Sequence, residues 1–264
     1  SMTVGMIAGT AAAADVAGPT RAQKLLPGAA RLAHAARLPG GAGLVMPAGA
    51  GPRPALDPSR LAGSKLEFAQ HLAKALGFVA LHNLDRVRLL SVPWIEGHTP
   101  GSFDHRGDVP RLFAAIDALQ PEPLQRHTRS LHERFRKSEH QDLAVVLADL
   151  QEPRAWFPFL RTLRQRCATV ILLHILAPEE ETPPWQRGEE LDLLDVEFPN
   201  QRTTVRVDAA MLRAYREELE RHVARIRQFC WQTGIGYVRL NSGTPLAPPL
   251  FRRLREAGVL RSRG

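Results

Sequence analysis

Cysteine and long apolar runs are scarce in this sequence, and each scarcity excludes a class of protein. The chain has two cysteines, Cys167 and Cys230, which lie far apart and belong to no CxxC pair. We expect two reduced, buried thiols there, and neither a disulfide nor a zinc site. No apolar run approaches the roughly 18 residues that a membrane-spanning helix needs. Together these features predict a cytoplasmic protein with no membrane span.

Aromatic residues are absent from the first 64 positions and begin only at Phe68. More than half of residues 1–64 are Ala, Gly or Pro, and a segment with so few large side chains can bury little apolar surface. We therefore divide the chain into a poorly ordered or irregular N-terminal segment, residues 1–64, and a folded domain, residues 65–264. No basic residue precedes the first apolar stretch, so an export signal is not expected.

The net charge is +8, and the isoelectric point is near 10.4. A basic balance can indicate a protein that binds nucleic acid. Here, however, arginines alternate with glutamates in Leu212–Phe229, which is typical of a solvated helix face with ion pairs one turn apart. Nucleic acid is therefore an alternative partner and not the expected one, and its binding would weaken steeply with salt.

From residue 65 onward, helical and β-rich segments alternate along the chain. The predicted helices are Lys65–Leu84, Val109–Leu119, Thr128–Lys137, Trp156–Cys167, Ala209–Thr233 and Pro248–Leu260. The predicted strands are Arg86–Val92, Asp142–Leu150, Thr169–Leu176, Leu191–Phe198, Arg202–Val207 and Ile235–Leu240. Two of these strands are almost wholly apolar, which is typical of parallel strands buried on both faces. The alternation predicts an α/β protein with a mostly parallel sheet and helices on both faces.

From about Leu56 to Leu260 the chain resembles the family known as domain of unknown function 58. The matching stretches are Leu56–Arg60, Ser64–Val92, Arg106–Pro123, Asp142–Pro153, Thr169–Pro184, Gly188–Glu197, the helix around Tyr215, and Ile235–Leu260. Their order and spacing carry the resemblance, because none is a sharp motif alone. The resemblance implies a von Willebrand factor A-like (vWA-like), Rossmann-like fold.

In vWA domains a metal site lies at the carboxyl ends of the strands, and the resemblance places its ligands here. The DxSxS loop falls on Asp57 and Ser59, with Leu61 in place of the second serine. The threonine position falls on Thr128 and the late aspartate on Asp149. These oxygen ligands suit Mg²⁺, which a partner's carboxylate would complete. The lost serine makes a degenerate site the alternative, in which the same residues serve as turn former, helix N-cap and helix cap.

Upstream of Asp57 the sequence departs from the family. The family's Y-x-P-G-D and I-D-W stretches are missing, and so is the buried strand that leads into the DxSxS loop. Gly43–Pro47 is the nearby segment that could supply a strand. The alternatives are a strand from a partner chain, or a decayed or truncated family member.

The resemblance implies a protein-binding scaffold or adaptor, associated with an ATPase of the MoxR-type AAA+ class, and not an enzyme. A metal-dependent phosphoesterase using Asp57 and Asp149 is an alternative, although no evident nucleophile or general base accompanies them. The sequence contains no GxSxG, GxGxxG or GxxxxGK[ST] motif, so acyl-transfer and nucleotide chemistry have no sequence support.

Three other features admit both a structural and a functional interpretation. His174 lies inside an apolar strand, where a hydrogen-bonded core histidine is the expected role. Trp156 begins an aromatic helix that we assign to the core and not to base stacking. Glu179–Glu181 follow a strand's carboxyl end, where they could bind a cation or a basic surface, but a solvated loop is the default.

Overall fold

The computed structural model describes residues 3–9, 46–47, 65–92, 102–119, 141–150, 153–194, 202–246, 252 and 254–256. Within them the helices are α2 (Lys65–His82), the short 3-10 turn η3 (Arg106–Asp108), α3 (Val109–Asp117), α5 (Pro153–Arg166), α6 (Pro178–Glu181) and α7 (Ala209–Thr233). The strands are β1 (Thr3–Gly9), β2 (Met46–Pro47), β3 (Arg86–Val92), β4 (Ser102–Phe103), β5 (Gln141–Ala148), β6 (Cys167–Leu176), β7 (Glu190–Leu194), β8 (Arg202–Arg206) and β9 (Gly236–Asn241).

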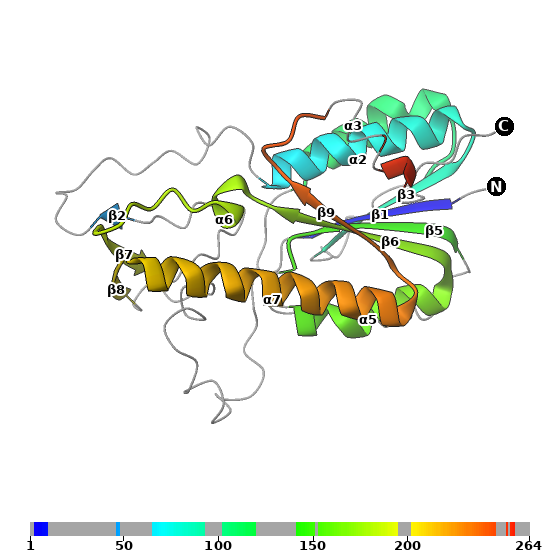
Figure 1. Ribbon diagram of the computed structural model, residues 1–264. Coiled ribbons are helices and arrows are strands. Elements are labelled where there is room, and N and C mark those ends of the chain that lie inside the picture. The colour runs from blue at the N-terminus through cyan, green and yellow to red at the C-terminus, as the bar shows by residue number, and fades with distance from the viewer. Residues whose placement is uncertain are drawn as a thin grey trace.

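The main sheet has six strands in the order β4-β3-β1-β5-β6-β9. Every neighbouring pair is parallel except β3–β4, which places one short antiparallel strand at an edge. Helices α2 and α3 cover one face, and α5 and α7 cover the other (Figure 1). The predicted α/β architecture is therefore confirmed.

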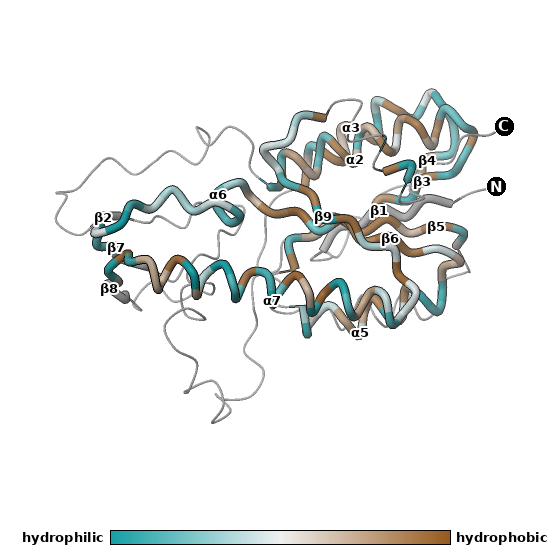
Figure 2. The backbone as a smooth tube through the Cα atoms, in the orientation of Figure 1, coloured by the Kyte–Doolittle hydropathy of each residue, from teal (hydrophilic) through white to brown (hydrophobic). Residues whose placement is uncertain are grey.

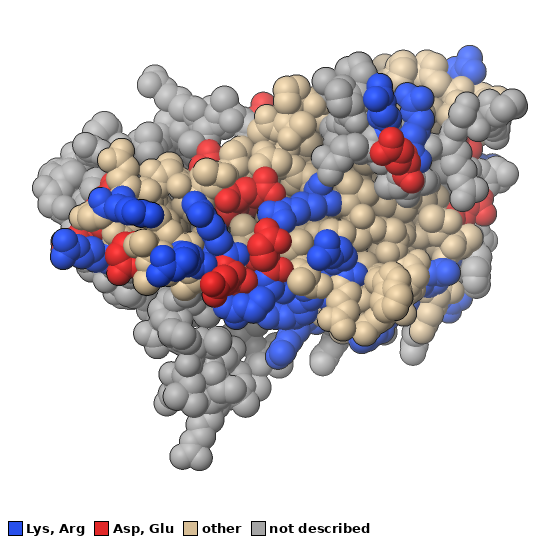
Figure 3. All heavy atoms as spheres, viewed as in Figure 1, with Lys and Arg blue, Asp and Glu red and all other residues tan. Residues whose placement is uncertain are grey.

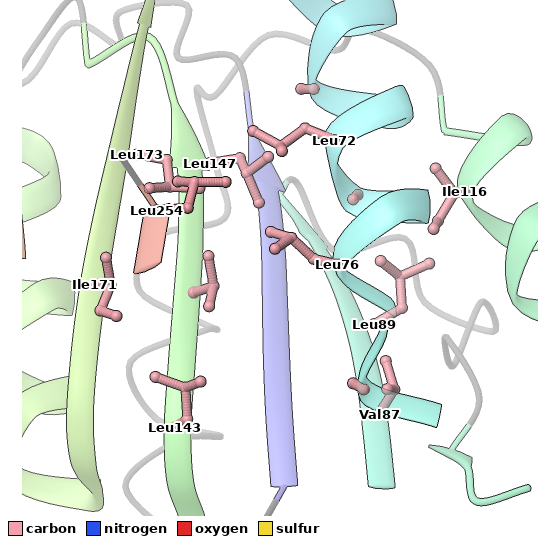
Figure 4. Packing of buried hydrophobic residues seen from close by; sticks show 14 of the residues in the cluster. Leu72, Leu76, Val87, Leu89, Ile116, Leu143, Leu147, Ile171, Leu173 and Leu254 are labelled. Carbon is pink, nitrogen blue, oxygen red and sulfur yellow. The ribbon is translucent and has the colours of Figure 1, made fainter. Parts of the chain in front are cut away.

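Strand β5 shows why this sequence folds as a central strand. Successive side chains of a strand point to opposite faces, so an apolar run supplies two cores at once. Leu143, Val145 and Leu147 join a cluster with the buried side of α2, which includes Leu72 (Figure 4). The opposite face of β5 joins a second cluster with α5 and α7 through Ala144, Val146 and Ala148. The largest fully buried side chain of this second cluster is Trp156.

The centre of the sheet is filled by a segment that the sequence analysis does not identify. Strand β1, Thr3–Gly9, pairs in parallel with β3 on one side and β5 on the other. Of the alternatives that the sequence left open, the one in which Gly43–Pro47 supplies this strand is wrong, since Met46–Pro47 instead forms β2 and pairs with β7. The physical reason is pattern length: Thr3–Gly9 gives seven residues without proline, whereas Gly43–Pro47 ends in proline, which cannot donate to a central ladder.

Helix α7 is the longest element and links the two sheets. Asp208 caps its start by accepting from the backbone N–H of Met211 at 2.7 Å, and Gly234 ends it in the left-handed conformation (φ 68°). Its polar and apolar residues alternate along its length (Figure 2). Its first turns lie near the second sheet, β2-β7-β8, in which β7 and β8 form the predicted antiparallel hairpin.

Most of the predicted elements are present with boundaries shifted by a few residues. Ala209–Thr233 is reproduced as α7 without a shift. The predicted helix Thr128–Lys137 lies outside the described residues. Where the structure describes the chain, none of its helices combines the length and apolar character required to span a membrane.

Candidate functional site

The carboxyl ends of β1, β5, β6 and β9 lie at one edge of the sheet, which we call the crest. Numbered by their order in the chain, the six strands run 3-2-1-4-5-6, the order of a doubly wound sheet. Helix α2, the first described helix after β1, covers one face of the sheet, and α5, the first helix after β5, covers the other, so β1 and β5 flank the switch point (Figure 1). Ligands of open α/β sheets bind in the crevice at such a point.

Three charged side chains meet at the crest. Asp149 follows β5 directly, Glu180 lies in α6 just after β6, and Lys65 is the first residue of α2. The Nζ of Lys65 donates to Asp149 Oδ2 at 3.3 Å and to Glu180 Oε1 at 2.8 Å. The side chains of Lys65, Asp149 and Glu180 are only 4%, 2% and 11% exposed. We call these three residues the buried triad.

Lys65 is held in this place by its two partners and not by its local sequence. A cation at the first position of a helix is opposed by the helix dipole, and burial opposes it further. Burial acts to lower the pKa of Lys65, but the carboxylates of Asp149 and Glu180 outweigh it and raise that pKa above its usual value. The ammonium group therefore stays charged inside the protein.

Glu180 is fixed by hydrogen bonds to its carboxylate and to its backbone carbonyl oxygen. Its Oε2 accepts from the backbone N–H of Ala177 at 2.7 Å, which closes the first turn of α6. Tyr215 of α7 donates its hydroxyl to the Glu180 carbonyl oxygen at 2.8 Å. Burial raises the pKa of Glu180 above its usual range, although the Lys65 ammonium acts in the opposite direction. The same Lys65 ammonium contacts both carboxylates of the triad.

His174 of β6 contacts the backbone of Asp149, one of the three triad residues. Its Nε2 lies 2.9 Å from the Asp149 carbonyl oxygen, and its Nδ1 lies 3.0 Å from the Tyr237 hydroxyl. A carbonyl oxygen only accepts, so Nε2 carries the proton and Nδ1 accepts from Tyr237. Burial lowers the pKa of His174 to about 3, and His222 acts in the same direction. The predicted role of His174, a satisfied core histidine, is confirmed.

Leu150, next to Asp149, has an unusual backbone. Its φ is 49°, in the left-handed region that a bulky residue rarely adopts, and its side chain is fully buried. Such a conformation persists only where the surroundings fix it, at a cost of roughly 1–3 kcal/mol. Here Lys65 fixes the Asp149 carboxylate and His174 fixes its carbonyl. The crest therefore holds a strained backbone at Leu150, directly beside Asp149.

A half-buried network surrounds the triad on its outer side. Arg239 of β9 donates to Glu181 at 2.7 Å and to Glu220 of α7 at 3.0 Å, and Asn241 donates to the second Glu181 oxygen. Figure 3 shows acidic and basic side chains interleaved over this part of the surface. The outer crest thus presents hydrogen-bonding groups of both signs that are already held in position.

The structure describes one of the four predicted metal ligands. Asp149 lies at the crest, as predicted, and is buried. Asp57, Ser59 and Thr128 lie outside the described residues, so the four-residue site remains a prediction. Its described part does not fit Mg²⁺, because the Lys65 ammonium already occupies the Asp149 carboxylate and would repel a divalent ion there. The described residues also contain no group of three or more His, Cys, Asp or Glu able to hold a metal.

The sequence analysis does not predict two residues of the triad, Lys65 and Glu180. The expectation of a solvated loop at Glu179–Glu181 is wrong for Glu180, because α6 turns it inward to meet Lys65. The sequence pattern indicates Lys65 only as the start of a helix. A lysine in a first turn, against the helix dipole and just before an apolar face, is the one signal that pointed to it.

The two cysteines are poorly suited to covalent catalysis. Burial raises the pKa of Cys167 to about 11 and that of Cys230 to about 12. Both are free, buried thiols, as predicted, and a thiol is a weak nucleophile when it is not ionised. Trp156 is also fully buried, which confirms its assignment to the core.

Comparisons with known proteins supply no relative: no family model, no curated protein and no solved structure matches the chain. The resemblance to the domain of unknown function 58 family stays a prediction from the sequence stretches that carry it.

Proposed function

We propose that this protein is a vWA-like scaffold that binds another protein through its crest. The observation that carries the proposal is the strand order with its switch point between β1 and β5, directly beside Asp149. Open sheets of this order place their ligands at that position. The antiparallel strand β4 does not disturb the arrangement, because it lies at the edge of the sheet and β3 separates it from β1.

The energetics of the crest also support a binding role. Buried charge and a strained residue lower stability, and such features cluster where a protein binds or switches. Ser242, just after β9, is buried and its hydroxyl has no hydrogen-bond partner in the described part of the chain. An unpaired buried hydroxyl is uncommon in a folded protein and adds to the cost of this region.

The proposed partner is a protein, and the sequence resemblance names its class as a MoxR-type AAA+ ATPase. Binding would use the interleaved charges of the outer crest, which are already fixed by one another and so lose little entropy on association. No catalytic step is proposed, since the described cysteines are not activated and the charged triad is buried.

The test uses two exposed acidic residues at opposite ends of the sheet. Glu179 lies in α6 at the crest, and Asp142 lies at the amino end of β5. The full chain, Glu179→Arg and Asp142→Arg are titrated by calorimetry against a purified MoxR-type ATPase from the same organism. We expect Glu179→Arg to weaken binding at least tenfold, about 1.4 kcal/mol, with Asp142→Arg unchanged. Equal effects of both substitutions, or no binding by the unmodified chain, would contradict the proposal.

A further inference from the structure

We propose that the ammonium group of Lys65 is the resident cation of the crest, in the place that a divalent metal would otherwise take between Asp149 and Glu180. The proposal concerns the triad itself and holds whether or not the crest binds a protein partner.

The first argument is geometric. The Lys65 Nζ bridges two carboxylates that come from the ends of different strands, at 3.3 Å from Asp149 and 2.8 Å from Glu180. Bridging oxygen ligands from separate strand ends is what a metal ion does in a site of this kind. The ammonium performs the same task with hydrogen bonds, and it ties α2 to both strand ends.

The second argument is the cost of placing lysine there. Lys65 is 6% exposed and begins a helix, so burial and the helix dipole both oppose its charge. Since a buried cation persists against both costs, the two carboxylates require it.

The third argument is charge balance. The Lys65 ammonium, with a single positive charge, contacts two buried carboxylates, and burial raises the pKa of Glu180. A divalent ion would neutralise both carboxylates in full. Removing the lysine side chain should therefore convert the triad into a cation site, provided that the space the side chain leaves is open.

Two substitutions separate charge from space. Lys65→Ala removes the ammonium and leaves room between the carboxylates, whereas Lys65→Met removes the ammonium and fills most of that room. Thermal unfolding of the full chain is followed with increasing MgCl₂, MnCl₂ or CaCl₂, and with EDTA. An ion that binds only the native state raises Tm in proportion to the logarithm of its concentration above Kd.

We expect the unmodified protein to show no metal-dependent rise in Tm. Lys65→Ala should unfold at a lower temperature and regain much of the loss with metal, while Lys65→Met should lose as much and regain nothing. In Lys65→Ala/Asp149→Asn the metal response should disappear, because one of the two carboxylates is gone.

Two results would overturn the proposal. One is an Asp149-dependent rise in Tm of the unmodified protein with metal, which would mean that the ion and not the lysine is resident. The other is a Lys65→Ala protein that ignores metal. If Lys65→Ala does not fold alone, the titration is made during refolding: recovery that needs metal supports the proposal, and recovery without metal, or no recovery, overturns it.

Discussion

The middle of the central strands and their carboxyl ends are equally buried but chemically opposite. In β5, Val145 and Val146 are 1% and 0% exposed, and each belongs to one of the two apolar clusters. A few residues further on, Asp149 is 4% exposed and faces an ammonium group. In β6, Leu172 and His174 are both fully buried, two residues apart on the same face.

The difference distinguishes the apolar residues that stabilise the fold from the charged residues that the fold positions at the crest. Burying apolar surface stabilises by roughly 25 cal/mol per Å², with no dependence on a partner group. Burying a charge costs several kcal/mol and is tolerated only with a matched partner. The apolar middle of the sheet can therefore account for the stability of the fold, whereas the buried charges of the crest lower it. We expect binding at the crest.

The largest expected effect comes from breaking the triad. Lys65→Met leaves two carboxylates buried without their cation, and we expect it to lower the free energy of unfolding by about 3–5 kcal/mol. Leu72→Ala in the apolar cluster should cost a similar amount, about 2–5 kcal/mol, through lost contacts and a cavity. Urea unfolding near neutral pH measures both losses.

The two losses differ in how they can be repaired. Adding Asp149→Asn and Glu180→Gln to Lys65→Met removes the unmatched charges and should restore most of the stability. The same two substitutions added to Leu72→Ala should worsen it, because Lys65 is then the unmatched charge. Repair in the Leu72→Ala background would show that the triad is not a unit separate from the apolar core.

A smaller and pH-dependent effect is expected at His174. Its pKa in the folded protein is about 3, below its usual value near 6.5, so the unfolded chain binds the proton more readily. This contribution to stability is present above pH 6.5 and is lost as the pH falls toward 3. His174→Gln keeps a donor for the Asp149 carbonyl but cannot titrate. We therefore expect it to lose about 1–2 kcal/mol at neutral pH and to flatten the decline below pH 6.5.

Tyr237→Phe is the matched control for that experiment. It removes the same hydrogen bond at Nδ1 but keeps the imidazole, so the acid decline should stay as steep as in the unmodified protein. Taking differences between variants also removes the contribution of Glu180. Its raised pKa acts with the opposite sign, since that stability is lost as the pH rises. A decline that is unchanged in His174→Gln would assign the acid sensitivity to other groups.

Sequence patterns predict the part of the fold that apolar periodicity dictates. The runs that became β5 and β6 and the caps of α7 are local signals, and their elements are confirmed. Strand β1 was missed because Thr3–Gly9 is short and precedes a long Ala-, Gly- and Pro-rich stretch, so nothing local marks it as central. Its position depends on pairing with strands far along the chain, which periodicity does not encode.

The candidate site was predicted only through Asp149. The pairs that make up the triad are far apart in sequence: Lys65 and Asp149 are separated by 84 positions, and Lys65 and Glu180 by 115. Such pairings are set by the topology of the sheet, and each residue alone has an ordinary explanation as a helix start or a loop. The family resemblance predicts oxygen ligands for a metal at this position, and a lysine cation is not part of that pattern.

The smallest expected effect comes from an exposed counterpart of the triad. Lys74 of α2 pairs with Asp117 of α3, but these side chains are 20% and 59% exposed. Water already solvates that carboxylate, so we expect Asp117→Asn to cost about 0–1 kcal/mol and to lose even that in high salt. Asp149→Asn should cost several times more and be insensitive to salt, because it leaves the buried Lys65 with one carboxylate only. Urea unfolding of both variants at low and high NaCl measures the contrast. Both are Lys–Asp pairs that tie α2 to another element, so equal costs would mean that burial is not what distinguishes the crest.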